Sequence, residues 1–193
     1  TSPQLYKQIL VGVFERVYSI GSVFRAEKHA TTRHLNEYVS LDAECGFITD
    51  HTDLMRLETR LMRHVVAHLE STCSDAFATL GATIPVVPDG DCFPTLKLRE
   101  AQELIKEKTG QDKTNEPDLE PEDERWLCTY AREELGSDFI FITHYPMSKR
   151  PFYTYEDEAD PDYSKSFDLL FRGVEITTGG QRVHEPEQLI EQA

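Results

Sequence analysis

Two arginines, a glutamate and a histidine stand at the mouths of a polar loop within residues 23–44, a stretch whose ends alternate like the strands of a β-hairpin. Arg25 and Glu27 close the first strand, and Arg33 and His34 precede the second. Arginine keeps its charge and binds phosphate oxygens through paired hydrogen bonds, so these residues are candidates for holding a polyphosphate. On chemistry alone, ion pairs between the two strands explain them equally well.

A second group of charged residues lies near the C-terminal end of the chain. Asp168 and Glu175 are seven residues apart across a glycine turn, so they can approach each other on neighbouring strands. Two carboxylates beside a phosphate would bind Mg²⁺, a hard cation that prefers oxygen ligands. Gly179 and Gly180 leave room for a ligand or a second backbone, and Arg182 follows them. A turn-rich hairpin with incidental acids is the alternative.

The elements around these residues predict a mixed α+β fold, with an antiparallel sheet flanked by helices and forming part of a larger unit. Apolar spacing and capping residues predict helices over residues 3–14, 51–77, 95–110, 121–137 and 185–193. Strand-like segments separated by turn residues occupy residues 16–27, 37–48, 138–146, 150–155, 165–173 and 174–184. The 193 residues suit one domain and are few for two.

Composition restricts the location and the partners. The net charge of −15 makes the chain a poor general binder of nucleic acid, although basic residues cluster locally in the hairpin. No apolar run is long enough for a transmembrane helix, and the start lacks the layout of a signal peptide, so we expect no membrane association. Four scattered cysteines without a CxxC pair suit reduced thiols and predict a cytoplasmic protein.

Taken together, the motifs are more specific than any one alone. "SPQLYKQ", "FRAE", "TTRHLNEY" with "DAE", "RPFYT" and "SFDLLFRGVEITTGGQR" occur in an order and spacing that resemble the catalytic domain of class II aspartyl-tRNA synthetases of the archaeal and eukaryotic type. The resemblance runs from Ser2 to about His184, and residues 75–135 are its least distinctive part. It implies the class II synthetase fold, an antiparallel sheet flanked by helices, over residues 1–193.

The resemblance implies an ATP site built mainly on the hairpin. Arg25 would hold the α-phosphate and bridge to the aspartate carboxylate, as the catalytic residue, while Arg33 and His34 would orient the outer phosphates. Glu27 would contact the adenine, and Tyr38 would stack on it. The full set of ATP-binding residues implied in this way is Arg25, Glu27, Arg33, His34, Leu35, Tyr38 and Glu175.

The resemblance also implies a pocket for aspartate and a metal site. Its aspartate-binding residues would be Gln4, Lys7, Arg25, Tyr153, Thr178 and Arg182, and its Mg²⁺ ligands Asp168, Glu175 and Thr178. Physical chemistry supports this choice of amino acid, because Lys7 and Arg182 supply fixed positive charge for a side-chain carboxylate. Asparagine would leave that charge unpaired in a partly buried pocket.

The implied reaction is attack of the aspartate α-carboxylate on the α-phosphorus of ATP, which gives aspartyl-adenylate and pyrophosphate. The acyl group then passes to the 3′-terminal adenosine of tRNA, and catalysis depends on positioning and charge stabilisation. ATP is the substrate and Mg²⁺ the metal, the other partners are L-aspartate and tRNA, and the family forms homodimers.

Departures from the family pattern leave alternatives open. The anticodon-binding barrel and the first and third signature motifs do not occur in the sequence, so we expect a fragment with weak or no activity by itself. The parent enzyme could charge the aspartate tRNA alone or the asparagine tRNA as well. The alternatives are an asparaginyl-tRNA synthetase, a paralogue that makes asparagine through the same adenylate, and a non-catalytic synthetase-like binding module.

Overall fold

A computed structural model describes residues 4–26 and 35–193 of the chain. It contains two compact units, Thr1–Thr49 and Asp50–Ala193, and each is described by itself. The predicted ATP-binding residues Glu27, Arg33 and His34 lie outside the described residues.

The first unit is a helix followed by a hairpin. Helix α1 (Gln4–Phe14) leads into β1 (Arg16–Phe24), which pairs antiparallel with β2 (Glu37–Cys45). The backbone N–H of Arg25 donates to the carbonyl of Asn36 at 2.9 Å, one position beyond the last strand pair. The predicted helix and hairpin are therefore confirmed, and Arg25 lies at the end of the ladder, where the loop begins.

Helix α1 does not bury the apolar face that its sequence predicts. Leu5, Ile9 and Phe14 are each more than 60% exposed, whereas Lys7 is only 6% exposed. Within residues 5–14, whose burial the structure describes, the one buried side chain is thus a cation.

The second unit begins with a long helix that is shorter than predicted. The helix predicted over residues 51–77 is divided into α2 (His51–Thr72) and α3 (Ser74–Leu80). Between them, Cys73 has φ −125° and ψ 18°, outside the helical region. The hydroxyls of the last two α2 residues both donate to the carbonyl of His68 and compete with the backbone for that acceptor.

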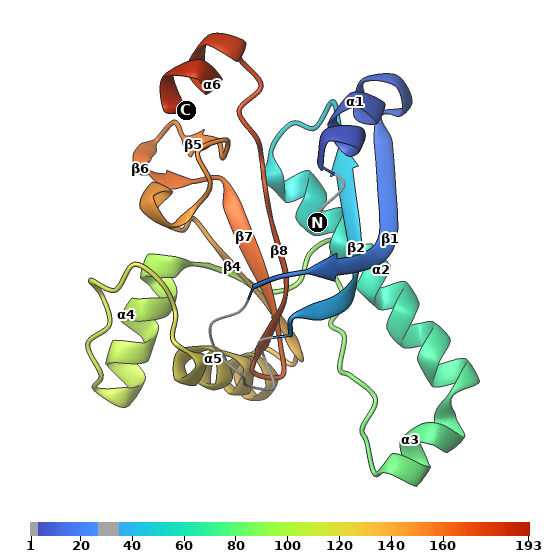
Figure 1. The fold of residues 1–193 in the computed structure, drawn as a ribbon. Coiled ribbons are helices and arrows are strands. Elements are labelled where there is room, and N and C mark those ends of the chain that lie inside the picture. Colours follow the sequence, from blue (N-terminus) through green and yellow to red (C-terminus); the bar gives the residue numbers. More distant parts are fainter. Residues whose placement is uncertain (1–3, 27–34) are drawn as a thin grey trace. The chain divides into compact units, whose positions relative to one another are not determined.

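The sheet of the second unit contains four strands in the order β3-β4-β7-β8. Their bounds are Thr95–Lys97, Phe139–Thr143, Ser166–Phe171 and Val174–Gly180. β4, β7 and β8 are antiparallel and β7 and β8 form one hairpin, as Figure 1 shows, whereas β3 pairs with β4 in parallel. The segment of β3 was predicted as the start of a helix, but α4 (Leu98–Thr109) begins only after these residues have paired with β4.

Helices cover both faces of this sheet. Alternate residues of β4 point to opposite faces. Ile140 and Ile142 pack with residues of α4 and α5 (Pro121–Glu134), whereas Phe139 and Phe141 pack with residues of α2. In Figure 1, α4 and α5 accordingly lie together on one side of the sheet. The α+β class with an antiparallel sheet flanked by helices is confirmed, with β3 as its one parallel strand among the described residues.

The segment 150–155 was predicted as a strand, and that prediction is wrong. A short 3-10 helix, η1 (Met147–Lys149), precedes it, and the N–H of Thr154 donates to the carbonyl of Pro151 at 2.9 Å, which closes a turn. The acidic stretch that follows forms a small hairpin of β5 (Glu156–Asp157) and β6 (Asp160–Ser164).

The last element is helix α6 (Pro186–Gln192), close to the predicted helix over residues 185–193. Among the described helices, none combines the length and the apolar character needed to cross a membrane.

Candidate functional site

The β7–β8 hairpin determines which way the candidate metal ligands point. Asp168 lies opposite Thr178, and Leu170 lies opposite Glu175, with a bulge between these two pairs. Opposite residues share a face, and so do residues two apart on one strand. Without the bulge, Glu175 and Thr178, three residues apart, would point to opposite faces. The bulge therefore brings all three predicted Mg²⁺ ligands to the face that packs against α5.

Arg150 holds two of these three residues. Its Nη2 donates to both carboxylate oxygens of Asp168 at 2.9 Å, and its Nη1 donates to Oγ1 of Thr178 at 3.0 Å. The guanidinium lies 4.1 Å from the centre of the Tyr145 ring. Burial, together with the negative charge of Asp168, raises the pKa of Tyr145, so the phenol stays protonated. Arg150 was not among the predicted site residues.

Two further carboxyl groups near Asp168 have raised pKa values. Burial of its carboxyl, followed by the charge of Asp168, raises the pKa of Glu175 to about 7, although the residue as a whole is exposed. Burial also raises the pKa of Glu58, on α2, to about 7, and a hydrogen bond with Thr177 opposes the shift. Thr177 lies on the other face of β8, so Glu58 and Glu175 are separated by the sheet.

These oxygens fit the chemistry of a hard divalent cation. Repulsion between Asp168 and Glu175 is the condition that a bound cation relieves, and the Thr178 hydroxyl adds a neutral oxygen. Within residues 4–26 and 35–193, no three His, Cys, Asp or Glu side chains converge as a metal-binding group. A cation here would therefore take two carboxylates at most and complete its shell with hydroxyl, water or substrate oxygens.

Tyr153 and Arg182, both predicted to bind aspartate, lie together. The Arg182 guanidinium is 4.4 Å from the centre of the Tyr153 ring. The backbone supports this arrangement, because Thr154 forms a bridge with Arg182 and the N–H of Val183 donates to the carbonyl of Tyr153 at 2.9 Å. The structure thus places a fixed positive charge on an aromatic face at the end of β8.

The glycines of β8 are explained by neighbours within the fold. A Cβ on Gly179 would lie 2.5 Å from Cζ of Phe167, and a Cβ on Gly180 would lie 3.1 Å from the carbonyl oxygen of Lys165. The close approach expected at these positions therefore exists, and the approaching group is the protein itself.

In the first unit, Arg25 and Tyr38 are neighbours across the hairpin. The Arg25 guanidinium is 5.5 Å from the centre of the Tyr38 ring. Leu35 is 54% exposed, and Gln4 is the first residue of α1.

Lys7 is buried beside two carboxylates of β2. Its Nζ lies 3.6 Å from Oδ1 of Asp42 and 3.4 Å from Oε1 of Glu44. Its charge is therefore fixed in position and already compensated within the unit.

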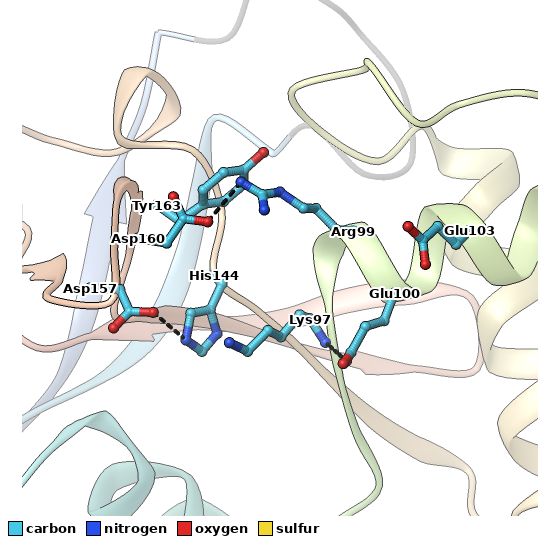
Figure 2. A pocket seen from close by; sticks show the side chains of 8 residues that line it. All are labelled: Lys97, Arg99, Glu100, Glu103, His144, Asp157, Asp160 and Tyr163. Atoms are coloured by element: carbon cyan, nitrogen blue, oxygen red, sulfur yellow. Dashed lines mark hydrogen bonds and ion pairs between the residues drawn. The ribbon is translucent and has the colours of Figure 1, made fainter.

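A hollow of about 190 Å³ opens at the carboxyl ends of β3 and β4 (Figure 2). Arg99 on its rim is paired with Asp160 at 2.8 Å and lies 3.8 Å from the centre of the Tyr163 ring. Burial and the charge of Lys97 lower the pKa of His144, and Figure 2 shows the two side chains side by side. Mixed charges surround this hollow, and none of the predicted site residues that the structure describes lines it.

A sequence signal for Arg150 was available. Arg150 stands in "SKRPFYTY", where a cation precedes a segment rich in aromatic residues, close to the predicted aspartate-binding Tyr153. For Glu58 no signal exists, because a glutamate on a long amphipathic helix is ordinarily exposed.

The tRNA synthetases class II (D, K and N) family model matches residues 1–192. A Thermus thermophilus protein named aspartate–tRNA(Asp/Asn) ligase is 53% identical over 98% of this chain and 44% of its own length. The structure superposes on an aspartyl-tRNA synthetase from Entamoeba histolytica with a TM-score of 0.90 and 32% identity, over 99% of this chain and 40% of that one. For asparaginyl-tRNA synthetase from Pyrococcus horikoshii complexed with asparaginyl-adenylate, the TM-score is 0.84 and the identity 28%, over 99% and 43%. The chain spans less than half the length of these proteins.

Proposed function

Because this chain belongs to the class II tRNA synthetases of the D, K and N group, we propose that its protein activates L-aspartate with ATP and transfers it to the 3′ end of tRNA. The observation that carries the proposal is the 53% identity to the Thermus aspartate–tRNA(Asp/Asn) ligase over 98% of the chain. The name of that relative supports a protein that charges both the aspartate tRNA and the asparagine tRNA.

The choice of aspartate over asparagine rests on fixed positive charge. Arg182 on the face of Tyr153 would bind the side-chain carboxylate, and Gln4, Lys7 and Thr178 would complete the aspartate-binding set. Aspartate offers a carboxylate that can form charge-assisted hydrogen bonds with a guanidinium, whereas the neutral amide of asparagine forms weaker ones. Lys7, which two carboxylates already hold, would act by orienting them rather than by supplying free charge.

For ATP, we assign Arg25 to the α-phosphate and to the aspartate carboxylate, and Tyr38 to stacking on the adenine. Leu35 would contribute backbone to the nucleotide site. The remaining assignments follow the family resemblance alone: Glu27 to the adenine, and Arg33 and His34 to the outer phosphates.

Asp168, Glu175 and Thr178 would hold Mg²⁺, which when bound neutralises charge on the phosphates. Glu175 would also belong to the ATP-binding set. A homodimer and a cytoplasmic location complete the proposal, and the four free cysteines suit a reducing compartment.

The test is calorimetric titration with two non-hydrolysable adenylate analogues, aspartyl and asparaginyl, in Mg²⁺ buffer. We expect the aspartyl analogue to bind more tightly, and Arg182→Ala to abolish that preference. Arg60→Ala, a change at an exposed arginine of α2, is the matched control and should bind as the wild type does. The same titration and aminoacylation of both tRNAs are then measured with the protein as its gene encodes it.

Preference for the asparaginyl analogue would replace the proposal with an asparagine-specific enzyme. Binding of neither analogue by the gene-encoded protein would indicate a non-catalytic module. Adenylate formation without transfer to either tRNA would point to the asparagine-forming paralogue.

A further inference from the structure

The Arg150 side chain forms hydrogen bonds with oxygens that are predicted to bind the metal. It donates to three of them, both carboxylate oxygens of Asp168 and the hydroxyl of Thr178, at 2.9–3.0 Å. Asp168 is only 5% exposed, and the Arg150 side chain is 15% exposed, so the ion pair is largely removed from water. A divalent cation at this site would need the same oxygens.

We propose that Arg150 is the resident counter-ion of the Asp168–Thr178 oxygen set, and that a divalent cation binds these oxygens in competition with it. The proposal rests on the function given above and adds a positioning residue to that site. Arg150 keeps Asp168 and Thr178 in place before the cation arrives, and it lowers the affinity of the site for that cation.

The charges of the site support this exchange. A buried carboxylate needs a cation beside it, because an unpaired charge in the interior is strongly unfavourable. Arg150 meets that need for Asp168, whereas Glu175 lies on the same face of the sheet and brings a second negative charge toward Asp168. An incoming divalent cation would neutralise both carboxylates, but it would be repelled by the guanidinium if Arg150 stayed in place.

The binding of Arg150 is also incomplete. Its Nε is buried without a hydrogen-bond partner among the described residues, and such a group is unfavourable in the interior. The flat guanidinium lies 4.1 Å from the centre of the Tyr145 ring. The ring face orients the guanidinium toward Asp168 but accepts no hydrogen bond from its Nε. Three hydrogen bonds thus hold Arg150 firmly enough to order Asp168 and Thr178. Its Nε could gain a hydrogen-bond partner if the side chain moved when a cation binds.

The experiment uses Tb³⁺, a hard cation with oxygen preference, whose luminescence is sensitised by nearby tyrosine, here Tyr145. Tb³⁺ affinity, and Mg²⁺ affinity by competition, are measured for the wild-type chain, Arg150→Met and Arg150→Lys without any adenylate. Arg172→Met is the matched control, because Arg172 also pairs with a buried aspartate of the second unit, Asp138 at 2.9 Å, which is not a predicted metal ligand.

We expect Arg150→Met to bind both cations roughly tenfold or more tightly than the wild type, since one nearby positive charge is removed. Mg²⁺ should raise the melting temperature of Arg150→Met more than that of the wild type, because it replaces the lost counter-ion. Arg150→Lys, which keeps a point charge but lacks the fork, should lie between them, and Arg172→Met should match the wild type.

Equal or weaker cation binding by Arg150→Met would overturn the proposal, and so would binding of Tb³⁺ by none of the variants. If Arg150→Met folds only in Mg²⁺, that dependence supports the exchange, and Arg150→Lys supplies the affinity comparison. The adenylate titration tests the proposed function separately: a preference for the aspartyl analogue together with unchanged cation affinity would reject the role of Arg150 alone.

Discussion

Gly179→Ala tests whether the glycines of β8 serve the core or a ligand. The added Cβ would lie 2.5, 2.9 and 3.1 Å from three ring atoms of Phe167, whereas carbon atoms in contact normally lie about 3.5–4.0 Å apart. Phe167 is 3% exposed and meets Phe141 edge-on at 5.5 Å, so its ring has little room to move. Overpacking together with an off-rotamer ring should lower the free energy of unfolding by about 3 kcal/mol.

The assay is urea unfolding followed by the fluorescence of Trp126, the single tryptophan of the sequence, which packs against the core of the second unit. Phe167→Leu removes the atoms that clash, so the double variant should be clearly more stable than the sum of the two single changes predicts. Gly21→Ala is the control for a general effect of alanine, because no heavy atom beyond its chain neighbours lies within 4 Å of the added Cβ. If Gly179→Ala unfolds within 0.5 kcal/mol of the wild type, the packing argument is wrong and the space is available to a ligand.

Three further outcomes are expected. Burial lowers the pKa of His51 to about 4. The contribution of neutral His51 to the free energy of unfolding is therefore fully present above pH 6.5, and it is lost by up to about 3 kcal/mol as the pH drops to 4. His51→Gln should flatten this pH dependence in thermal melts taken across that range. Asp138→Asn should lower the free energy of unfolding, measured in urea, by about 2–3 kcal/mol. The Asp138 carboxylate pairs with the half-exposed Arg132 and Arg172 and accepts a hydrogen bond from the backbone N–H of Val86. Burial raises the pKa of Cys128 to about 11, so at pH 8 its alkylation, followed by mass spectrometry, should be roughly a hundredfold slower than that of free cysteine, and equal rates would contradict this.

The elements with regular apolar spacing could be predicted from the sequence. The hairpin of β1 and β2, helices α4 and α5 and the strands β4, β7 and β8 lie close to their predicted bounds. The errors fall where side chains or neighbours override local preference. Helix α2 ends at Cys73, where the hydroxyls of the two preceding residues donate to the carbonyl of His68. Residues 95–97 form a strand because β4 provides the pairing partner.

The candidate site was predicted as a set of residues but not as a set of bonds. Tyr153 and Arg182 were both predicted to bind aspartate, and their side chains do lie together. The backbone bridge between Thr154 and Arg182 brings their two segments side by side. The segment "SKRPFYTY" marked Arg150 as a candidate cation of the site, but its pairing with Asp168, eighteen residues further along the chain, could not be read from that local pattern. Lys7 was predicted to supply fixed positive charge for the aspartate carboxylate, and only the fold shows the two protein carboxylates beside it.

The bulge in β8 explains how one strand serves two different faces. Thr177 points toward α2, where it bonds with Glu58, while Thr178 and Glu175 point with Asp168 toward α5. A regular strand would have sent Glu175 to the α2 face, because it lies three residues from Thr178. Glu58 and Glu175 would then share one face, and Asp168 would lose the carboxylate neighbour that the bulge provides. The irregular register is therefore what places a second carboxylate beside Asp168, and the competition between Arg150 and a cation depends on it.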